Sequence, residues 1–328
     1  MKAFILAAGQ GTRLRPFTDE IPKPLIPVLN RPVMARVMDL CRTHGFLDLV
    51  ANLHYKGERI EQAFGDGHAY GVNLCYSWED QLWGTAGGVR RQADFLGSET
   101  FAVVSGDVVT DLDLTQLLAF HRASGAMATM AVKEVSNPAR FGVVVTDERG
   151  RIQSFQEKPA PGTEKSRRAN TGIYILEPEV FNHIPKDEVF DFGHQLFPKL
   201  LQMGLPLYAM QTDAYWSDVG TLSQYLYTNW ELLTHMELKQ RVGRNTVIEP
   251  GAIISRDVLI GDHCHIQSGA VVMGYSCIGN GTVVKPSARV LDSIVWTADD
   301  HVSVGDEVIR SIVTNGRCVS VGFKGLAA

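Results

Sequence analysis

The sequence lacks the features that mark secreted, disulfide-bonded and membrane proteins. Its 328 residues include few cysteines, and no two of them form a Cys-x-x-Cys pair. This pattern favours the reduced cysteines of a cytoplasmic protein. The N-terminus lacks the length of a signal peptide, and no run reaches the roughly 18 apolar residues of a membrane span. The five cysteines are Cys41, Cys75, Cys264, Cys277 and Cys318.

An excess of positive charge is also missing. The formal net charge of −5 argues against a nucleic-acid partner and gives no reason to expect membrane attachment. Any anion site must therefore depend on local charge. With 45% apolar and 20% charged residues, the composition is that of a globular protein. The length is large for one domain and reasonable for two.

Residues 1 to about 235 alternate apolar strand-like runs with amphipathic stretches. This alternation predicts an α/β domain with a Rossmann-like, mostly parallel sheet covered by helices. A ligand is then expected at the carboxyl ends of the strands. The expected strands are Phe4–Ala7, Leu47–Asn52, Leu74–Ser77, Phe101–Val104 and Met127–Val132, and the expected helices are Val33–Gly45, Lys56–Phe64, Gly87–Phe95 and Asp113–Ser124.

From about residue 246 the period changes to six. Such a hexapeptide repeat is typical of a parallel β-helix, in which the recurring aliphatic side chain points inward. Trp296, Val302 and Val308 hold the same phase. We predict domains at 1–235 and 247–328, joined by a linker at 236–246. The aliphatic residues at every sixth position are Ile248, Ile254, Ile260, Ile266, Val272, Ile278, Val284 and Val290.

The segment Gly9–Arg13 directly follows the buried-strand pattern of Ala3–Leu6. Its two glycines leave backbone N–H groups free to approach an anion, and Arg13 and Lys23 add positive charge. Position 14 is Leu, which excludes a Rossmann fingerprint, and no Gly-Lys-Ser/Thr follows, which excludes a P-loop. A polyphosphate is the ligand that suits this loop.

The residues from Gly9 to Pro24 resemble the signature G-x-G-T-R-L-x-P-x-T-x-x-x-P-K-P of the sugar-1-phosphate nucleotidylyltransferases at every fixed position. The resemblance implies that a nucleoside triphosphate and a sugar 1-phosphate react to give an NDP-sugar and pyrophosphate. It also implies a left-handed β-helix after the catalytic domain, commonly used for homo-oligomer assembly or regulation. The attacking phosphate is already an anion near neutral pH, so positioning and charge neutralisation are what the protein must supply.

Catalytic and metal-binding roles follow from the resemblance. Arg13 matches the arginine that holds the β- and γ-phosphates, and Lys23 matches the lysine near the reacting centre. Asp107, in a Gly-Asp motif, and Asp218, in an Asp-x-Gly motif, match the ligands of Mg²⁺. Asp111 is the competitor to Asp107, and we interpret it as a turn or capping residue.

Two further sets of residues match the segments that bind the substrates. The resemblance assigns nucleotide binding to Leu6, Ala8, Gly9, Gly11, Thr12, Glu79, Gly84, Thr85 and Ala86. It assigns sugar-phosphate binding to Gly142, Glu157, Lys158, Asn170 and Thr171.

Glu79 bears on the choice of base. A carboxylate accepts two hydrogen bonds and suits the N1–H and N2–H₂ donors of guanine, whereas thymidylyl relatives carry glutamine. This favours GTP, unless Glu79 simply points to solvent, but it does not settle the sugar. Within the family, a mannose-1-phosphate guanylyltransferase is the first choice. A glucose-1-phosphate uridylyl- or thymidylyltransferase is the alternative. A non-catalytic regulatory subunit that binds NDP-sugar is the alternative of another class, and acyl transfer by the β-helix with His263, His265 or His301 is a further one.

Overall fold

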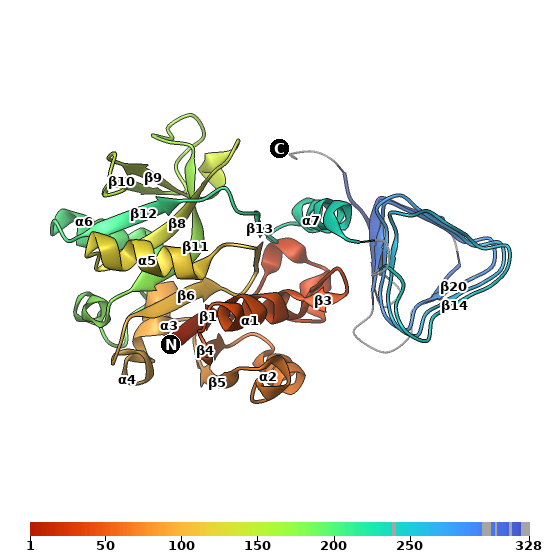
Figure 1. Cartoon of the computed structure of the whole chain (residues 1–328), viewed down its shortest axis with the longest axis horizontal. Coiled ribbons are helices and arrows are strands. Elements are labelled where there is room, and N and C mark those ends of the chain that lie inside the picture. Colours follow the sequence, from red (N-terminus) through yellow and green to blue (C-terminus); the bar gives the residue numbers. More distant parts are fainter. Residues whose placement is uncertain (238–240, 297–302, 306, 315–316, 323–328) are drawn as a thin grey trace.

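The computed structural model describes residues 1–237, 241–296, 303–305, 307–314 and 317–322. These residues form an α/β domain and a triangular β-helix, with the last long helix between them (Figure 1). Among the described residues, no helix is long and apolar enough to cross a membrane.

A mixed nine-stranded sheet forms the centre of the α/β domain, in the order β10-β9-β11-β6-β1-β4-β5, with β8 beside β11 and β12 beside β8. The predicted parallel strands are neighbours: β6 (Phe101–Ser105), β1 (Lys2–Leu6), β4 (Asp48–Leu53) and β5 (Asn73–Trp78). Antiparallel pairing begins at β11 (Arg168–Leu176), which contacts β6, β8 (Ala128–Glu134) and β9 (Gly142–Thr146). The remaining strands are β10 (Ile152–Glu157), antiparallel to β9, and β12 (Leu207–Gln211), parallel to β8.

Helices cover both faces of this sheet, which confirms the predicted fold class. One apolar cluster joins the sheet to α1 (Val33–Thr43), α2 (Gly57–Phe64) and α5 (Leu114–Ser124). The other joins it to α3 (Thr85–Arg90), α4 (Ala93–Leu96) and α6 (Phe197–Gln202). The single helix expected at Gly87–Phe95 is wrong, because the chain leaves helical geometry at Gln92, whose side chain donates to Ser77 Oγ at 2.8 Å.

Short elements complete the α/β domain around the loop that follows β1, residues 7–26, which we call the first loop. Three 3-10 helices follow β1: η1 (Thr12–Leu14), η2 (Phe17–Asp19) and η3 (Lys23–Leu25). Two small sheets lie nearby, β2 (Pro27–Val28) with β3 (Arg31–Pro32), and β7 (Val108–Thr110) with β13 (Trp216–Asp218). The long helix α7 (Leu222–His235) follows β13, and the Thr221 hydroxyl caps it by accepting from Gln224 N.

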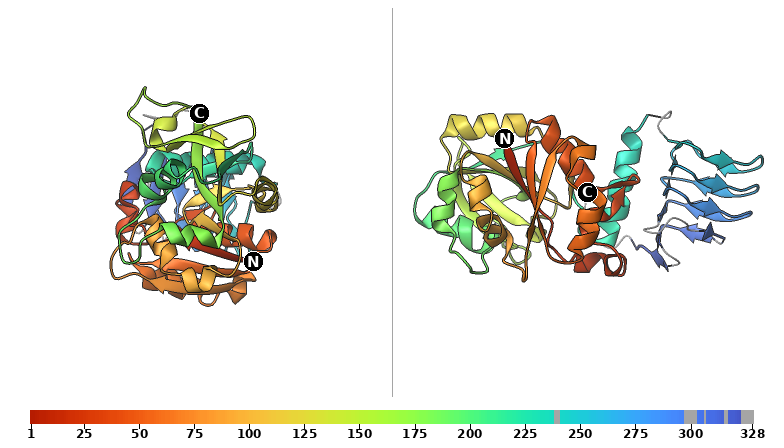
Figure 2. Two further views of the ribbon diagram at one scale, coloured as in Figure 1. Left: turned by 90° about the vertical axis from the view of Figure 1, so that its left-hand side faces the viewer. Right: turned by 90° about the horizontal axis from the view of Figure 1, so that it is seen from below.

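The β-helix has three parallel faces, stacked in coils as the hexapeptide pattern predicts (Figure 2). Its first face contains β14 (Val247–Ile248), β17 (His265–Ile266), β20 (Val283–Val284) and β23 (Ser303–Val304), and its second β15 (Ile253–Ile254), β18 (Val271–Met273), β21 (Arg289–Leu291) and β24 (Glu307–Ile309). The third contains β16 (Leu259–Ile260), β19 (Cys277–Ile278), β22 (Ile294–Val295), β25 (Ser311–Thr314) and the antiparallel β26 (Arg317–Ser320).

The predicted phase is wrong at Trp296. Ile278 pairs with Val295, so that Val295 takes the inward position and Trp296 faces out. The spacing between the inward-facing residues is shortened at a tight turn, where Asp292 adopts a left-handed backbone (φ 49°) and its carboxylate accepts from Tyr275 N. Val308 is inward as expected, and Val302 lies outside the described residues.

The outward face of the β-helix packs on the α/β domain. One apolar cluster contains Leu14 and Phe17 from the first loop together with Cys277, Ile294 and Trp296 from the β-helix. The Phe17 and Trp296 rings lie 6.2 Å apart between centroids, and Trp296 is only 3% exposed. The β-helix therefore packs directly against Leu14 and Phe17, which follow the segment that resembles a phosphate-binding loop.

Candidate active site

The first loop leaves the carboxyl end of β1 and is held by a network of hydrogen bonds. Ala7 N donates to Asn52 Oδ1 at 2.7 Å, and the Thr18 hydroxyl donates to Gly11 O at 2.9 Å. Gly11 has a φ of 64°, and a Cβ there would lie 2.9 Å from Thr18 Cγ2, so this position requires glycine. Gly9 and Thr12 are exposed, Leu6 is half-buried and Ala8 is buried.

Four charged side chains meet beside this loop. The Lys23 ammonium contacts Asp107 Oδ2 and lies 3.4 Å from Asp218 Oδ1. Arg13 Nη2 lies 4.0 Å from Asp218 Oδ2, and the Arg13 side chain is 59% exposed. Asp107 follows β6, whereas Asp218 ends β13, and the pairing of β13 with β7 brings the two carboxylates together. The four predicted catalytic and metal-binding residues thus form one cluster.

The two carboxylates differ in their electrostatics. Burial and the neighbouring Asp107 charge raise the pKa of Asp218. Burial opposes ionisation of Asp107 as well, but the Lys23 ammonium outweighs it and holds the pKa of Asp107 below its usual value. Burial also disfavours the Lys23 charge, yet Asp107 and Asp218 outweigh it and raise the pKa of Lys23. The cluster therefore stabilises a positive charge between two carboxylates.

This donor set fits a magnesium ion that is shared with substrates. Carboxylate oxygens are ligands that Mg²⁺ prefers, and it usually takes one or two of them together with phosphate and water oxygens. The position between Asp107 and Asp218 already accommodates a cation, the Lys23 ammonium. Within the described ranges, no group of three or more His, Cys, Asp or Glu residues could hold a metal. Asp111 accepts from Tyr215 N at 2.7 Å, as expected of a turn residue.

A cavity of about 170 Å³ opens beside this cluster. Its walls combine the charged cluster with all five residues predicted to bind the sugar phosphate. Glu157 lies near Lys158, with 3.2 Å between Oε1 and Nζ. The lining includes Arg13, Asp107, Asp218, Gly142, Glu157, Lys158, Asn170 and Thr171. Segments far apart in the chain therefore meet at a single opening.

Two of the sugar-site residues use their polar groups within the protein. Thr171 is 2% exposed, and its hydroxyl donates to Ala131 O at 2.8 Å, so the part that it plays in sugar-phosphate binding stays a prediction. Asn170 Nδ2 donates to Tyr174 Oη at 2.8 Å, and its Oδ1 accepts from Gly172 N at 3.1 Å. Both residues shape the cavity wall.

Glu79 is buried, so the alternative that it points to solvent is wrong. Its Oε1 accepts from Asn52 Nδ2 at 2.8 Å and its Oε2 from Trp83 N at 3.4 Å. Burial raises the pKa of Glu79. Asn52 in turn accepts from Ala7 N, which links Glu79 to the start of the first loop. A role in base recognition stays a prediction and would require Glu79 to exchange these bonds.

The Gly84–Ala86 segment begins α3 and is held by a neighbouring loop. Thr85 N and its hydroxyl both donate to Asp191 Oδ1 at 2.9 Å, and Ala86 N donates to Phe190 O at 2.9 Å. A Cβ at Gly84 would lie 2.6 Å from Phe190 O. Ala86 is fully buried and its N–H is already paired within the protein. Its role in nucleotide binding stays a prediction.

Some contacts within the site were not predicted from the sequence. Phe141 and Trp216 form an edge-to-face pair, 5.1 Å between centroids, in the cavity wall. Gly193 lies in a π-helical segment, Phe192–Leu196, where a Cβ would collide with the Glu157 carboxylate. Phe141 and Trp216 did carry local signals, since they directly precede Gly142 and Ser217-Asp218, which the resemblance had assigned to the site.

Comparisons with known proteins agree with this arrangement. The sequence model of the Nucleotidyl transferase family matches residues 2–235, and that of the Bacterial transferase hexapeptide (six repeats) family matches residues 241–274. The chain is 39% identical to a UTP–glucose-1-phosphate uridylyltransferase of Synechocystis, over 90% of this chain and 87% of that protein. It is 32% identical to a mannose-1-phosphate guanylyltransferase of Mycobacterium tuberculosis, over 90% and 79%. HddC from Yersinia pseudotuberculosis superposes with a TM-score of 0.61 at 25% identity, covering 70% of this chain and 99% of HddC.

Proposed function

The chain belongs to the nucleotidyl transferase family, and on that premise we propose that it is a cytoplasmic enzyme that makes an NDP-sugar and pyrophosphate from a nucleoside triphosphate and a sugar 1-phosphate. One observation carries the proposal: the cavity beside the first loop is lined by Arg13, Asp107 and Asp218 together with the Glu157–Lys158 pair. This combination offers charge for phosphates and hydrogen-bond acceptors for sugar hydroxyls at one opening.

The reaction is an in-line displacement. A phosphate oxygen of the sugar 1-phosphate forms a bond to the α-phosphorus, and the bond from that phosphorus to the leaving pyrophosphate breaks. The attacking oxygen is already anionic near pH 7, so no side chain has to remove a proton. Arg13 is exposed toward the opening, and its planar guanidinium can hold two oxygens of the leaving group at once.

The remaining groups position the phosphates. Lys23 is held by Asp107 and Asp218 and would contact the phosphates near the reacting centre. Asp107 and Asp218 would also hold Mg²⁺, which when bound supplies charge neutralisation between the two sets of phosphates. Glu157 would accept from sugar hydroxyls, and Lys158 would contact the sugar phosphate. Positioning and electrostatics then account for catalysis, as in other phosphoryl transfers.

For the substrates we propose GTP and mannose 1-phosphate. Glu79 supports guanine, because a buried carboxylate beside the loop that begins α3 can accept but not donate. The relative named as a mannose-1-phosphate guanylyltransferase is in keeping with this choice. UTP with glucose 1-phosphate is the second candidate, favoured by the relative that is 39% identical and named for that pair.

Pyrophosphate release tests the substrates directly. GTP, UTP, dTTP, ATP and CTP are each assayed with mannose 1-phosphate and with glucose 1-phosphate in the presence of Mg²⁺. A single strong pair identifies the enzyme, and UTP or dTTP would refute the argument from Glu79. Ligand binding without turnover across the whole grid would instead favour the non-catalytic regulatory subunit.

We further propose that the β-helix mediates homo-oligomer assembly. Val247, Ile248 and Ile253 are exposed apolar residues on its first coil, with exposed fractions of 55%, 41% and 58%. Trp296 is buried against Phe17 and is therefore not available for contacts between subunits. Sedimentation velocity of the wild type and of the Ile253→Lys variant tests this assignment, which predicts a smaller species for the variant.

A further inference from the structure

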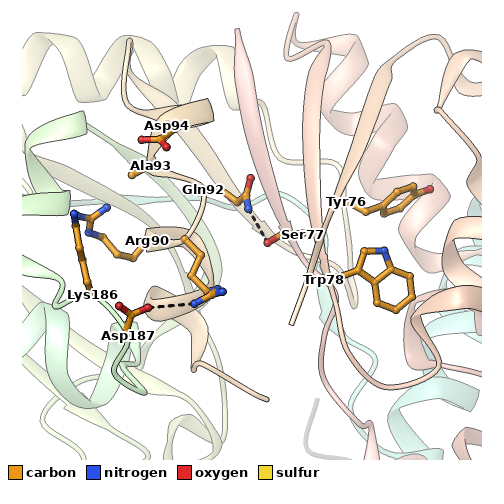
Figure 3. A pocket seen from close by; sticks show the side chains of 10 residues that line it. Tyr76, Ser77, Trp78, Arg90, Gln92, Ala93, Asp94, Lys186 and Asp187 are labelled. Atoms are coloured by element: carbon orange, nitrogen blue, oxygen red, sulfur yellow. Dashed lines mark hydrogen bonds and ion pairs between the residues drawn. The ribbon is translucent and has the colours of Figure 1, made fainter. Parts of the chain in front are cut away.

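A second polar cavity, of about 430 Å³, lies away from the site described above (Figure 3). It is bounded by the edge strand β5, the end of α3, the start of α4 and the loop at 186–187. Three of its lining side chains are cations, Arg90, Arg91 and Lys186, and two are carboxylates, Asp94 and Asp187. The site residues predicted from the sequence include none of these.

The cations of this cavity are only partly compensated. Arg91 Nη1 lies 3.4 Å from Asp187 Oδ1, and its guanidinium stacks on Trp83 at 4.7 Å from the ring centroid. Throughout the described part of the chain, neither Arg90 nor Lys186 forms an ion pair with a carboxylate. Asp94 and Asp187 lie well apart from each other (Figure 3). The cavity therefore holds two positive charges, on Arg90 and Lys186, without an ion-pair partner among the described residues.

Arg90 adds a second observation. Its Nε is buried and has no hydrogen-bond partner, although its guanidinium packs over the Phe181 ring at 5.7 Å from the centroid. A buried polar group without a partner requires an explanation, and an acceptor supplied by a ligand is one. Gln92 Nε2 and Ser77 Oγ, joined at 2.8 Å, add polar groups in the same wall. Tyr76 and Trp78 project from the other side of β5 (Figure 3).

We propose that this cavity binds a small phosphomonoester through Arg90 and Lys186, with Arg91 as a third cation. A doubly charged group with three oxygens suits guanidinium and ammonium donors, and arginine can meet two oxygens at once. The cavity is large enough for inorganic phosphate or for a phosphorylated sugar. These two sources share the phosphate chemistry and differ only in the attached carbon skeleton.

The cavity is connected to the nucleotide side of the enzyme by two elements. The helix α3 begins at Thr85 in the predicted nucleotide loop and ends at Arg90 in the cavity. The loop that carries Lys186 and Asp187 continues to Phe190, whose carbonyl accepts from both Ala86 N and Gly87 N. Resting on the proposed function, we infer that an anion here changes the apparent KM for the nucleoside triphosphate.

Binding is measured first, without turnover, so that the outcome does not depend on the proposed reaction. Isothermal titration of the full-length Arg13→Ala protein uses inorganic phosphate and, separately, glucose 6-phosphate, whose phosphate is not anomeric. The Arg13→Ala background weakens phosphate contacts at the first site. We expect Arg90→Gln and Lys186→Gln each to weaken binding at least tenfold, and the exposed control Arg122→Gln to change it less than twofold. Tighter binding of one probe identifies the source.

Lys186 keeps the test decisive if Arg90→Gln fails to fold, because Lys186 is exposed and its substitution leaves the core intact. Affinity in the Lys186→Gln protein within twofold of its parent would overturn the site. Coupling is then measured on the Arg13-containing enzyme as the KM for the nucleoside triphosphate with and without phosphate. We expect a shift of at least twofold that Lys186→Gln abolishes, and an equal shift in both proteins would overturn the coupling.

Discussion

Trp296 tests whether the β-helix holds the first loop, which we propose to bind phosphate, in its active shape. The Trp296→Ala substitution removes a side chain that is 3% exposed and that packs against Phe17 across the domain boundary. Truncation of a buried aromatic residue to alanine costs about 3–5 kcal/mol. The loss falls on the contact between domains, because the same cluster contains Leu14 on one side and Ile294 on the other.

A double-mutant cycle separates the ring pair from general loss of packing. Phe17→Ala, Trp296→Ala and the double variant are unfolded with denaturant. Because the rings lie 6.2 Å apart and inclined by 59°, we expect a coupling free energy of about 0.5–1.5 kcal/mol. Additive effects of the two substitutions would show that the rings do not stabilise each other.

The catalytic consequence follows from the position of Leu14, which is next to Arg13 and 1% exposed in this cluster. Small displacements of a positioning group can reduce rate by about a hundredfold, so we expect kcat of Trp296→Ala to fall ten- to a hundredfold. Val290→Ala is the control, since Val290 lies inside the coil and not at the boundary. Unchanged turnover in Trp296→Ala, or an equal loss in Val290→Ala, would refute the reasoning.

Three further substitutions test the site. Arg13→Ala is expected to lower turnover by about a thousandfold or more. The unfolding free energy should not change, because the Arg13 side chain is 59% exposed. Arg13→Lys should recover little of the rate, and near-normal turnover in Arg13→Ala would contradict the role given to this residue. Asp218→Asn is expected to raise the Mg²⁺ concentration needed for half-maximal rate and to lower the rate itself, and an unchanged titration argues against its role as a ligand. Glu79→Gln is expected to shift nucleotide preference from GTP toward UTP or dTTP, measured as the ratio of kcat/KM values. The same variant tests how stability depends on pH. Burial raises the pKa of Glu79, so the native state holds the proton more tightly than the unfolded chain does. The contribution of Glu79 to the free energy of unfolding is therefore complete below about pH 4.5 and declines as the pH rises through the native pKa. Relative to wild type, Glu79→Gln should therefore gain stability from pH 4 to pH 7, and no change with pH contradicts the sign.

The α/β and β-helix folds could be predicted because the spacing of apolar residues along the sequence indicates directly which residues are buried. The βα alternation identified β1, β4, β5 and β6, which lie side by side and parallel. The antiparallel part was not predicted, since β11 carries no local signal of its distant partners β6 and β8. Trp296 shows a second limit: a turn shortened at Asp292 exchanges two adjacent apolar residues, Val295 and Trp296, and the spacing of apolar residues cannot reveal this.

The site was predictable where a motif follows a strand. Asp107 was identified in this way, whereas Asp218 was identified from its Asp-x-Gly motif alone, and the pairing of β7 with β13 places both beside Lys23. Hydrogen-bond partners were not predictable, because they come from segments distant in sequence. Thr171 turns its hydroxyl toward Ala131, and Glu79 is engaged by Asn52. Motifs thus identified the neighbourhood, and tertiary contacts decide which atoms remain available.

Lys23 gives the enzyme a counter-ion that is part of its own chain. Where a bound metal neutralises the negative charge of its carboxylate or thiolate ligands, the protein often unfolds when the metal is removed. Here the ammonium contacts Asp107 and lies 3.4 Å from Asp218, so the repulsion between the carboxylates is offset before any ligand arrives. The protein should therefore keep its unfolding transition in a chelator such as EDTA while turnover stops. The metal is then required for catalysis and not for folding, so the chain can fold without it.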